Sequence, residues 1–170
     1  MESMFSGTLV FNQDISGWDT SSVTNMYWMF QYAPDFNQSL NSWDTSNVEY
    51  MNYMFQGAES FNRNLSNWNI SNLIEANGMF DGITLSTNNY DALLNGWSNT
   101  VDTSGGTLGV EFSGGNSLYS ESGEVGRDNL IDSWNWIITD GGLENLSLTG
   151  CGNLSISNSE YKLITNVSSG

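Results

Sequence analysis

The chain has 170 residues, which is long enough for one domain with a sizeable hydrophobic core. Its 19 acidic residues face only three basic ones, and the net charge of −16 repels nucleic acid and anionic lipid, so neither is expected as a partner. No apolar run approaches the roughly 18 residues of a membrane span, so no membrane insertion is expected. The single cysteine, Cys151, excludes an intrachain disulfide framework and a cysteine metal cluster.

A 25-residue period dominates about the first 83 residues. The segment WDTSSVTNMYWMF returns one period later as WDTSNVEYMNYMF, and a third, weaker copy begins with WNISNL. The aligned columns include Met4, Met29, Met54 and Met79; Phe5, Phe30, Phe55 and Phe80; Asn12, Asn37 and Asn62; and Trp18, Trp43 and Trp68. A fixed period of this length indicates a repeat solenoid, in which each coil buries its apolar face only by stacking on its neighbours.

Within one repeat, the apolar spacing predicts a short strand followed by tight turns. Trp18 and Thr20 are two residues apart, as on one face of a strand, and steps of three then lead to Val23 and Met26. We expect short parallel β-strands about 4.8 Å apart, with helical or 3₁₀ returns. On this geometry the tryptophan column forms an internal ladder. The asparagine column lies at a turn, where a buried amide can satisfy backbone groups of the next coil.

The sequence opens in the middle of a repeat, because Met1 falls in the column of Met26 and Met51. Two alternatives are expected from this register. The chain is either a fragment of a longer array or a subunit whose open first coil is covered by a neighbour.

Residues 84–142 predict an α+β cap on the end of the repeats. Ser86 or Thr87 can cap a helix whose inner face is formed by Tyr90, Leu93, Leu94 and Trp97. A strand is expected next, with alternating Leu108, Val110 and Phe112, and it ends at a glycine-containing turn over residues 113–116. A second helix is predicted over residues 124–133, with inner residues Val125, Leu130, Ile131 and Trp134.

The last segment, residues 143–170, has its own pattern. Leu143, Leu146, Leu148, Cys151 and Leu154 follow the L-x-x-L-x-L-x-x-C-x-x-L spacing of an ordinary leucine-rich repeat. Either a second array begins here, or the segment is a pair of β-strands packed on the cap.

The blocks WDTSSVTNMYWMF, WDTSNVEYMNYMF and SFNRNLSNWNISNL resemble the 25-residue repeats of the BspA-type leucine-rich-repeat surface proteins of bacteria. The later segments LSTNNYDALLNGW, VEFSGGNSLY and NLIDSWNWIITDGG resemble the part that often ends such arrays. The resemblance implies a leucine-rich-repeat-like solenoid that is extracellular or at the cell surface. It also implies adhesion or recognition of a protein or glycan on a host or neighbouring cell, and it supplies no catalytic residue. The third repeat departs from the pattern at Asn69, Ile70 and Ala76, so we expect it to decay towards its cap.

Outward positions of the predicted strands form a first candidate site. The aligned residues are Asp19, Asp44 and Asn69, with Ser21, Ser46 and Ser71 beside them. Like charges about 5 Å apart repel unless a cation or a bound donor lies between them, so Asp19 and Asp44 are a candidate calcium or ligand site. The alternative is a turn in which the aspartate accepts backbone N–H bonds. No other cofactor is expected.

Aromatic residues outside the core columns form a second candidate site. Tyr27, Trp28 and Tyr53 lead this group, and Trp28 is expected to stack in register with Tyr53. Exposed aromatic rings one coil apart could bind a sugar ring or another protein chain. The alternative is that these rings only cover the convex side of the coils.

No catalytic activity is expected. The sequence contains no histidine, no G-x-S-x-G motif and no phosphate-binding G-x-x-x-x-G-K motif. Two functions therefore remain open. The chain is either a recognition module or a structural subunit that assembles end to end, through its open first coil, into an extracellular filament or surface layer.

Overall fold

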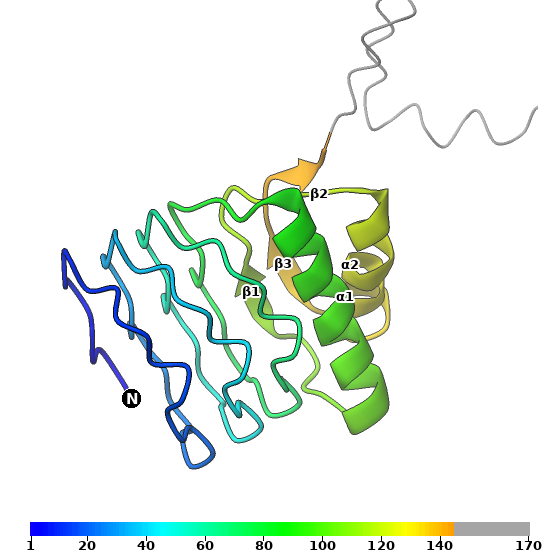
Figure 1. Cartoon of the computed structure of the whole chain (residues 1–170). Helices are drawn as coiled ribbons and strands as arrows, with labels where there is room; N and C mark the ends of the chain where they lie inside the picture. Colours follow the sequence, from blue (N-terminus) through cyan, green and yellow to red (C-terminus); the bar gives the residue numbers. More distant parts are fainter. Residues whose placement is uncertain (145–170) are drawn as a thin grey trace, which may run out of the picture.

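The computed structural model describes residues 1–144 of the chain. The first part of these residues winds into a stack of similar coils, and two helices with short strands lie against the last coil (Figure 1). Among the described residues, no helix is both long enough and apolar enough to cross a membrane.

Neighbouring coils are joined by a regular ladder of backbone hydrogen bonds. The N–H groups of Met26, Trp28, Phe30 and Tyr32 donate to the carbonyl oxygens of Tyr50, Asn52, Met54 and Gln56, at distances between 2.8 and 3.1 Å. Isolated parallel bridges join Asn25 to Tyr50 and Tyr50 to Glu75. Along this stretch each coil therefore donates to the coil that follows it, while Glu49 and Ile74 donate back to the coil before at 2.9 and 2.8 Å.

The parallel contact does not lie between Trp18 and Thr20, where the spacing predicts a strand. The Trp18 N–H donates to the Ile15 carbonyl at 3.1 Å and the Val23 N–H donates to the Thr20 carbonyl at 2.9 Å, so this stretch consists of tight turns. Thr20 is buried and its hydroxyl donates to the Asp44 carbonyl in the next coil at 2.9 Å. An inward side chain on a turn thus produces the same two-residue spacing as a strand.

Aromatic columns fill the core of the stack. The phenylalanine rings from Phe5 to Phe80 stack coil on coil, with centroids between 5.4 and 5.6 Å apart. Trp43 and Trp68 are buried, and their indole N–H groups donate to carbonyls of the preceding coil. Trp18 is instead 41% exposed and does not join the internal ladder, because within residues 1–144 no coil covers it.

The asparagine column lies at the surface and not in the core. Asn12 and Asn62 are exposed and Asn37 is half-buried. The Asn12 side-chain oxygen accepts the Asn37 backbone N–H at 2.9 Å, and the Asn37 oxygen accepts the Asn62 N–H at 3.1 Å. Each asparagine lies on a turn that faces water, and its side-chain oxygen accepts a backbone N–H of the next coil.

Two positions in each coil have left-handed backbone, and at two of these positions a tyrosine ring packs on the glycine one coil later. Tyr32 and Tyr53 have φ angles of 53° and 55°, and the residues one coil later are Gly57 and Gly78. A Cβ atom on Gly57 would lie 2.6 Å from the Tyr32 ring, and one on Gly78 would lie 2.3 Å from the Tyr53 ring. Glycine is required at both positions, because the φ angle is positive and the tyrosine ring leaves no room for a Cβ atom.

The cap is built from two helices and two pairs of short parallel strands. Helix α1 (Thr87–Ser104) and helix α2 (Glu121–Asp132) pack on each other. Strand β1 (Glu111–Ser113) pairs with β3 (Ile137–Thr139), and β2 (Leu118–Tyr119) pairs with β4 (Gly142–Leu143).

The cap differs from the sequence prediction at several bounds. Helix α2 begins three residues before the predicted Glu124, because the Ser120 side chain accepts the Ser122 N–H and caps it there. Val125 was expected inside but is 75% exposed. The first strand starts at Glu111, since Gly109 has a φ of 73° that interrupts the extended backbone after an exposed Leu108.

Helix α1 continues the tryptophan column into the cap. The Trp97 indole N–H donates to the Leu65 carbonyl at 3.2 Å, as the Trp68 indole does to the Leu40 carbonyl one coil earlier at 2.8 Å. Gly96 lies against Ser66 so closely that a Cβ atom would be 2.3 Å from the Ser66 carbonyl oxygen. The helix thus takes the place of a further coil.

One ion pair among the described residues joins helix α2 to the turn after strand β3. Arg127 Nε lies 2.8 Å from Asp140 Oδ2, which also accepts the Tyr90 hydroxyl at 2.9 Å. The guanidinium lies over the Tyr119 ring, 4.8 Å from its centroid. Burial, and then the Asp140 charge, raises the pKa of Tyr90 well above its usual value, so this hydroxyl stays protonated and donates.

The leucine-rich pattern predicted for residues 143–170 lies outside the described residues except at its first position. Leu143 belongs to β4, and Leu146, Leu148, Cys151 and Leu154 are not described.

Candidate functional site

The aspartate column forms turns. Asp19 Oδ1 accepts the Ser21 N–H at 3.1 Å and the Ser21 hydroxyl at 2.6 Å, and Asp44 Oδ1 accepts the same two groups of Ser46 at 3.0 and 2.6 Å. The serine hydroxyl and then the backbone N–H lower the pKa of both aspartates, while the Asp19 charge slightly opposes this shift at Asp44. Both carboxylates are exposed and remain charged in neutral solution.

The third coil repeats this turn without the charge. Asn69 Oδ1 accepts the Ser71 N–H at 3.0 Å. An amide therefore replaces the carboxylate as the turn acceptor, which supports the turn interpretation of the column. Across residues 1–144, no group of three or more acidic, cysteine or histidine side chains is arranged to hold a metal ion.

The aromatic candidates divide between two places. Tyr27 stacks on Trp28 at 5.2 Å and on Tyr50 of the next coil at 5.7 Å, and we call these three residues the aromatic face. Trp28 is 36% exposed, so the face is accessible. Tyr53 does not stack on Trp28; its ring covers Gly78 one coil further on. The register stack expected between Trp28 and Tyr53 is replaced by this contact.

A hydrogen-bond cluster fixes the aromatic face from behind. The Tyr27 hydroxyl donates to Glu75 Oε2 at 3.0 Å, and Asn52 Nδ2 donates to both the Tyr27 oxygen and Glu75 Oε2, at 2.9 and 2.7 Å. Burial, followed by the bond to Glu75, raises the pKa of Tyr27, so its hydroxyl stays a donor. Sequence reasoning missed Asn52 and Glu75, although Asn52 lies one period after Tyr27 and Glu75 one period after Tyr50, so the repeat could have indicated them.

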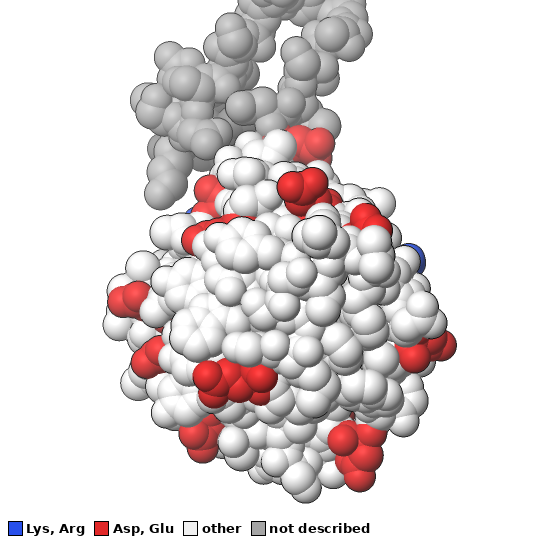
Figure 2. Space-filling model, turned by 90° about the vertical axis from the view of Figure 1, so that its left-hand side faces the viewer, with Lys and Arg blue, Asp and Glu red and all other residues white. Residues whose placement is uncertain are grey.

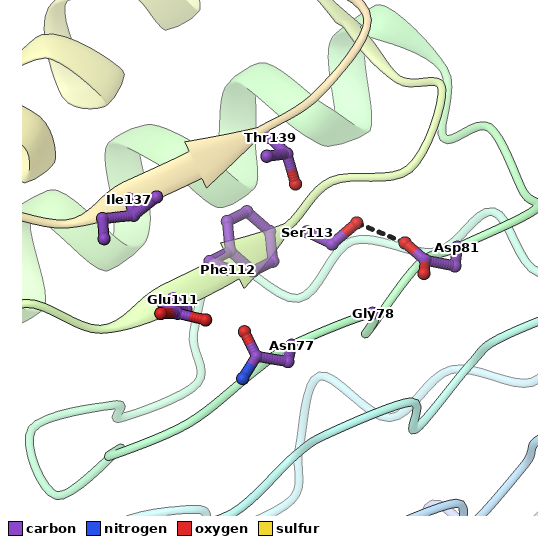
Figure 3. Close-up of a pocket in the computed structure, with 8 residues that line it drawn as sticks. All are labelled: Asn77, Gly78, Asp81, Glu111, Phe112, Ser113, Ile137 and Thr139. Carbon is purple, nitrogen blue, oxygen red and sulfur yellow. Dashed lines mark hydrogen bonds between the residues drawn. The ribbon is translucent and has the colours of Figure 1, made fainter.

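A shallow pocket of about 150 Å³ lies where the last coil meets the cap, and we call it the junction pocket. It is lined by Asn77, Gly78, Asp81, Glu111, Phe112, Ser113, Ile137 and Thr139. Figure 3 shows Asn77 facing Glu111 at one end and the Asp81 carboxylate meeting Ser113 at the other. The Ser113 hydroxyl donates to Asp81 Oδ1 at 2.5 Å. None of these residues was a candidate from the sequence, because the pocket depends on how the cap docks.

The opposite end of the stack carries exposed apolar side chains. Met4, Leu9, Val10 and Trp18 are 51%, 69%, 83% and 41% exposed, and we call them the first-coil face. Figure 2 views this end and shows a largely uncharged surface, with acidic residues within it and around its margin.

These features define a repeat protein, in which stacked 25-residue coils are closed at one end by a small α/β cap. A family model described as "Mycoplasma protein of unknown function, DUF285" matches residues 1–95, which is more than half of the chain. The chain therefore belongs to the DUF285 family. The match continues into α1, as does the tryptophan column. No curated protein and no solved structure matches the chain.

Proposed function

We propose that the chain is a non-catalytic, BspA-like recognition protein of the cell surface, and that its stacked coils form a leucine-rich-repeat-like solenoid. Its ligand is a protein or glycan of a host or neighbouring cell. The observation that carries the proposal is the aromatic face, in which Trp28 and Tyr27 are held in place yet remain accessible. Rigid, partly exposed aromatic rings bind sugar rings and protein side chains at a low cost in conformational entropy.

The cluster behind the face supports this function. Tyr27 is held by its bonds to Glu75 and Asn52, and by the Tyr50 ring. A ring that is already fixed loses little freedom when a ligand covers it, which favours binding. The net charge of −16 favours a neutral or basic ligand over an anionic one.

A glycan array and immobilised host-cell surface proteins test this function. We expect Trp28→Ala to weaken binding about tenfold or more, since a central aromatic residue commonly dominates an interface. Tyr32→Ala is the matched control, because Tyr32 is an aromatic residue of the same coil, is 55% exposed and lies outside the face. Asp44→Ala tests the aspartate column separately. Binding that survives Trp28→Ala and Tyr27→Ala in folded protein would contradict the aromatic face as the site.

A second candidate function is end-to-end assembly into a filament or surface layer, and the first-coil face favours it. The apolar side chains there, including Leu9 and Val10, are unusually exposed for an end that touches water alone. Sedimentation of the full chain over a range of concentrations tests assembly, with Val10→Asp as the blocking variant. A monodisperse monomer at high concentration would contradict this function.

A further inference from the structure

The junction pocket arises where the backbone ladder of the coils is interrupted. In the two preceding coils, the N–H groups of Trp28 and Tyr53 donate to the next element at 3.1 and 2.9 Å. Gly78 holds the same position in the last coil. Within residues 1–144 its N–H has no acceptor in the protein.

The interruption has a geometric cause. Strand β1 offers the Glu111 carbonyl to the Ala76 N–H at 3.0 Å and the Ser113 carbonyl to the Phe80 N–H at 3.2 Å. Two residues of extended β1 thus span the same distance as four residues of the turning coil. The donor midway between them, on Gly78, is left facing the gap that forms the pocket.

The pocket surrounds this donor with acceptors and no positive charge. Asp81 Oδ2 lies close to Gly78, the Glu111 carboxylate lies at the other end of the pocket beside Asn77, and Thr139 adds a hydroxyl (Figure 3). Of the basic side chains in the described part of the chain, Arg63 donates to the Asn37 carbonyl and Arg127 pairs with Asp140. Neither faces the pocket.

The free N–H donor and the two carboxylates together select a class of ligand. Two unneutralised carboxylates repel an anion, and the polar lining disfavours a purely apolar group. An ammonium group satisfies the carboxylates but places its hydrogens against the Gly78 N–H. Hydroxyl groups satisfy both the carboxylates and the Gly78 N–H, because a hydroxyl can donate to a carboxylate and accept from an N–H.

We propose that the junction pocket binds the ring of a neutral sugar, with hydroxyls at its two ends on Asp81 and Glu111 and a ring or hydroxyl oxygen on the Gly78 N–H. The volume of about 150 Å³ lies well below that of a drug-sized site, so the pocket holds a single ring of a glycan. Ile137 supplies an apolar wall for the C–H face of that ring. The site is separate from the aromatic face, so either site can fail without the other.

Titration of the full chain with the methyl glycosides of glucose, galactose, mannose and N-acetylglucosamine, followed by amide NMR, tests the proposal. We expect at least one glycoside at millimolar concentration to shift the amide signals of Gly78 and Asn77. Glu111→Gln, which keeps the size of an exposed side chain, should weaken that binding about tenfold, because it removes a charged hydrogen-bond acceptor. Glu121→Gln, at the start of α2, is the matched control and should leave binding unchanged.

Three outcomes would overturn the proposal. One is that no glycoside of the panel shifts these signals. Another is that binding persists at full strength in Glu111→Gln and in Asp81→Asn, both folded by circular dichroism. The third is that ethanolammonium chloride binds while the glycosides do not, which would assign the pocket to amines. Shifts confined to Tyr27 and Trp28 would support the aromatic face and contradict this pocket.

Discussion

Asp44 shows how a single side chain serves a turn and at the same time makes stability depend on pH. Its Oδ1 accepts two hydrogen bonds from Ser46, and the same arrangement recurs at Asp19. The pKa of each carboxyl is lowered in the folded chain, chiefly by the serine hydroxyl. The unfolded chain therefore binds protons more readily, so this stabilisation is present above about pH 4 and is lost as the pH falls through the lowered pKa.

We expect the double variant Asp19→Asn, Asp44→Asn to lose less stability than the wild type between about pH 4 and pH 2. Asparagine keeps the acceptor oxygen, as Asn69 does in the third coil, but does not titrate in this range. Urea unfolding at a series of pH values measures the effect. The double variant Ser21→Ala, Ser46→Ala should flatten the pH dependence in the same way. Identical pH profiles for the wild type and the two double variants would contradict a role of these serine–aspartate hydrogen bonds in the pH dependence.

Gly78 provides a residue-scale test of the packing between coils. With a φ of 63° and the Tyr53 ring 2.3 Å from any Cβ atom, Gly78→Ala should lower the free energy of unfolding by about 1–3 kcal/mol. Gly17→Ala is the control, since nothing lies within 4 Å of its Cβ position. Chemical denaturation measures both. Adding Tyr53→Ala to Gly78→Ala should restore only the part of the lost unfolding free energy that comes from the clash with the ring. Equal losses in Gly78→Ala and Gly17→Ala would refute the packing explanation.

At the scale of elements, α1 closes the stack by imitating a coil. Ser86, just before the helix, donates its N–H to Asn62 Oδ1 at 2.9 Å, as Asn62 does to Asn37 at 3.1 Å. The Trp97 indole then takes the position that Trp68 holds in the coil before. The cap is therefore joined to the stack by the same bonds that join one coil to the next.

Trp97→Phe tests this role, because it keeps an aromatic ring in the core but removes the indole bond to the Leu65 carbonyl, which then keeps only the Trp68 N–H at 3.1 Å. We expect a loss of about 0.5–1.5 kcal/mol in the free energy of unfolding from the missing hydrogen bond. Trp134→Phe is the control. The Trp134 indole donates to Asp102 at an exposed site, so this variant should lose less unfolding free energy. Thermal or urea unfolding compares the two, and a larger loss at Trp134 would show that α1 does not close the stack in this way.

The sequence predicted the elements better than their junctions. The period places Trp43 and Trp68 in one column, and the three- and four-residue spacing predicts a helix over most of α1. Spacing alone could not separate an inward turn residue such as Thr20 from a strand residue. Nor could it show the junction pocket, which depends on the register between the last coil and β1, and that register is set by contacts between residues far apart in the chain.

At the scale of the whole molecule, stability should grow with the number of coils. Each internal coil adds its ladder bonds and a set of buried phenylalanine, methionine and tryptophan side chains. A tandem duplication of residues 26–50 should therefore fold, with a higher free energy of unfolding and a larger dependence on denaturant. An inserted glycine-serine segment of the same length is the control and should give neither increase. A destabilised duplication would contradict nearest-neighbour stacking.

The backbone ladder also makes the stack chemically directional. Along the stretch from Met26 to Tyr32 and its equivalents, the N–H groups point towards the following coil, so the matching stretch of the first coil presents carbonyl oxygens on its outer side. Among the described residues, the carbonyls of Glu2, Met4 and Ser6 accept no hydrogen bond. Two molecules that met through this stretch would oppose acceptor to acceptor, which disfavours a symmetric pairing of these carbonyls. A partner that extends the ladder along this stretch must supply N–H donors to them.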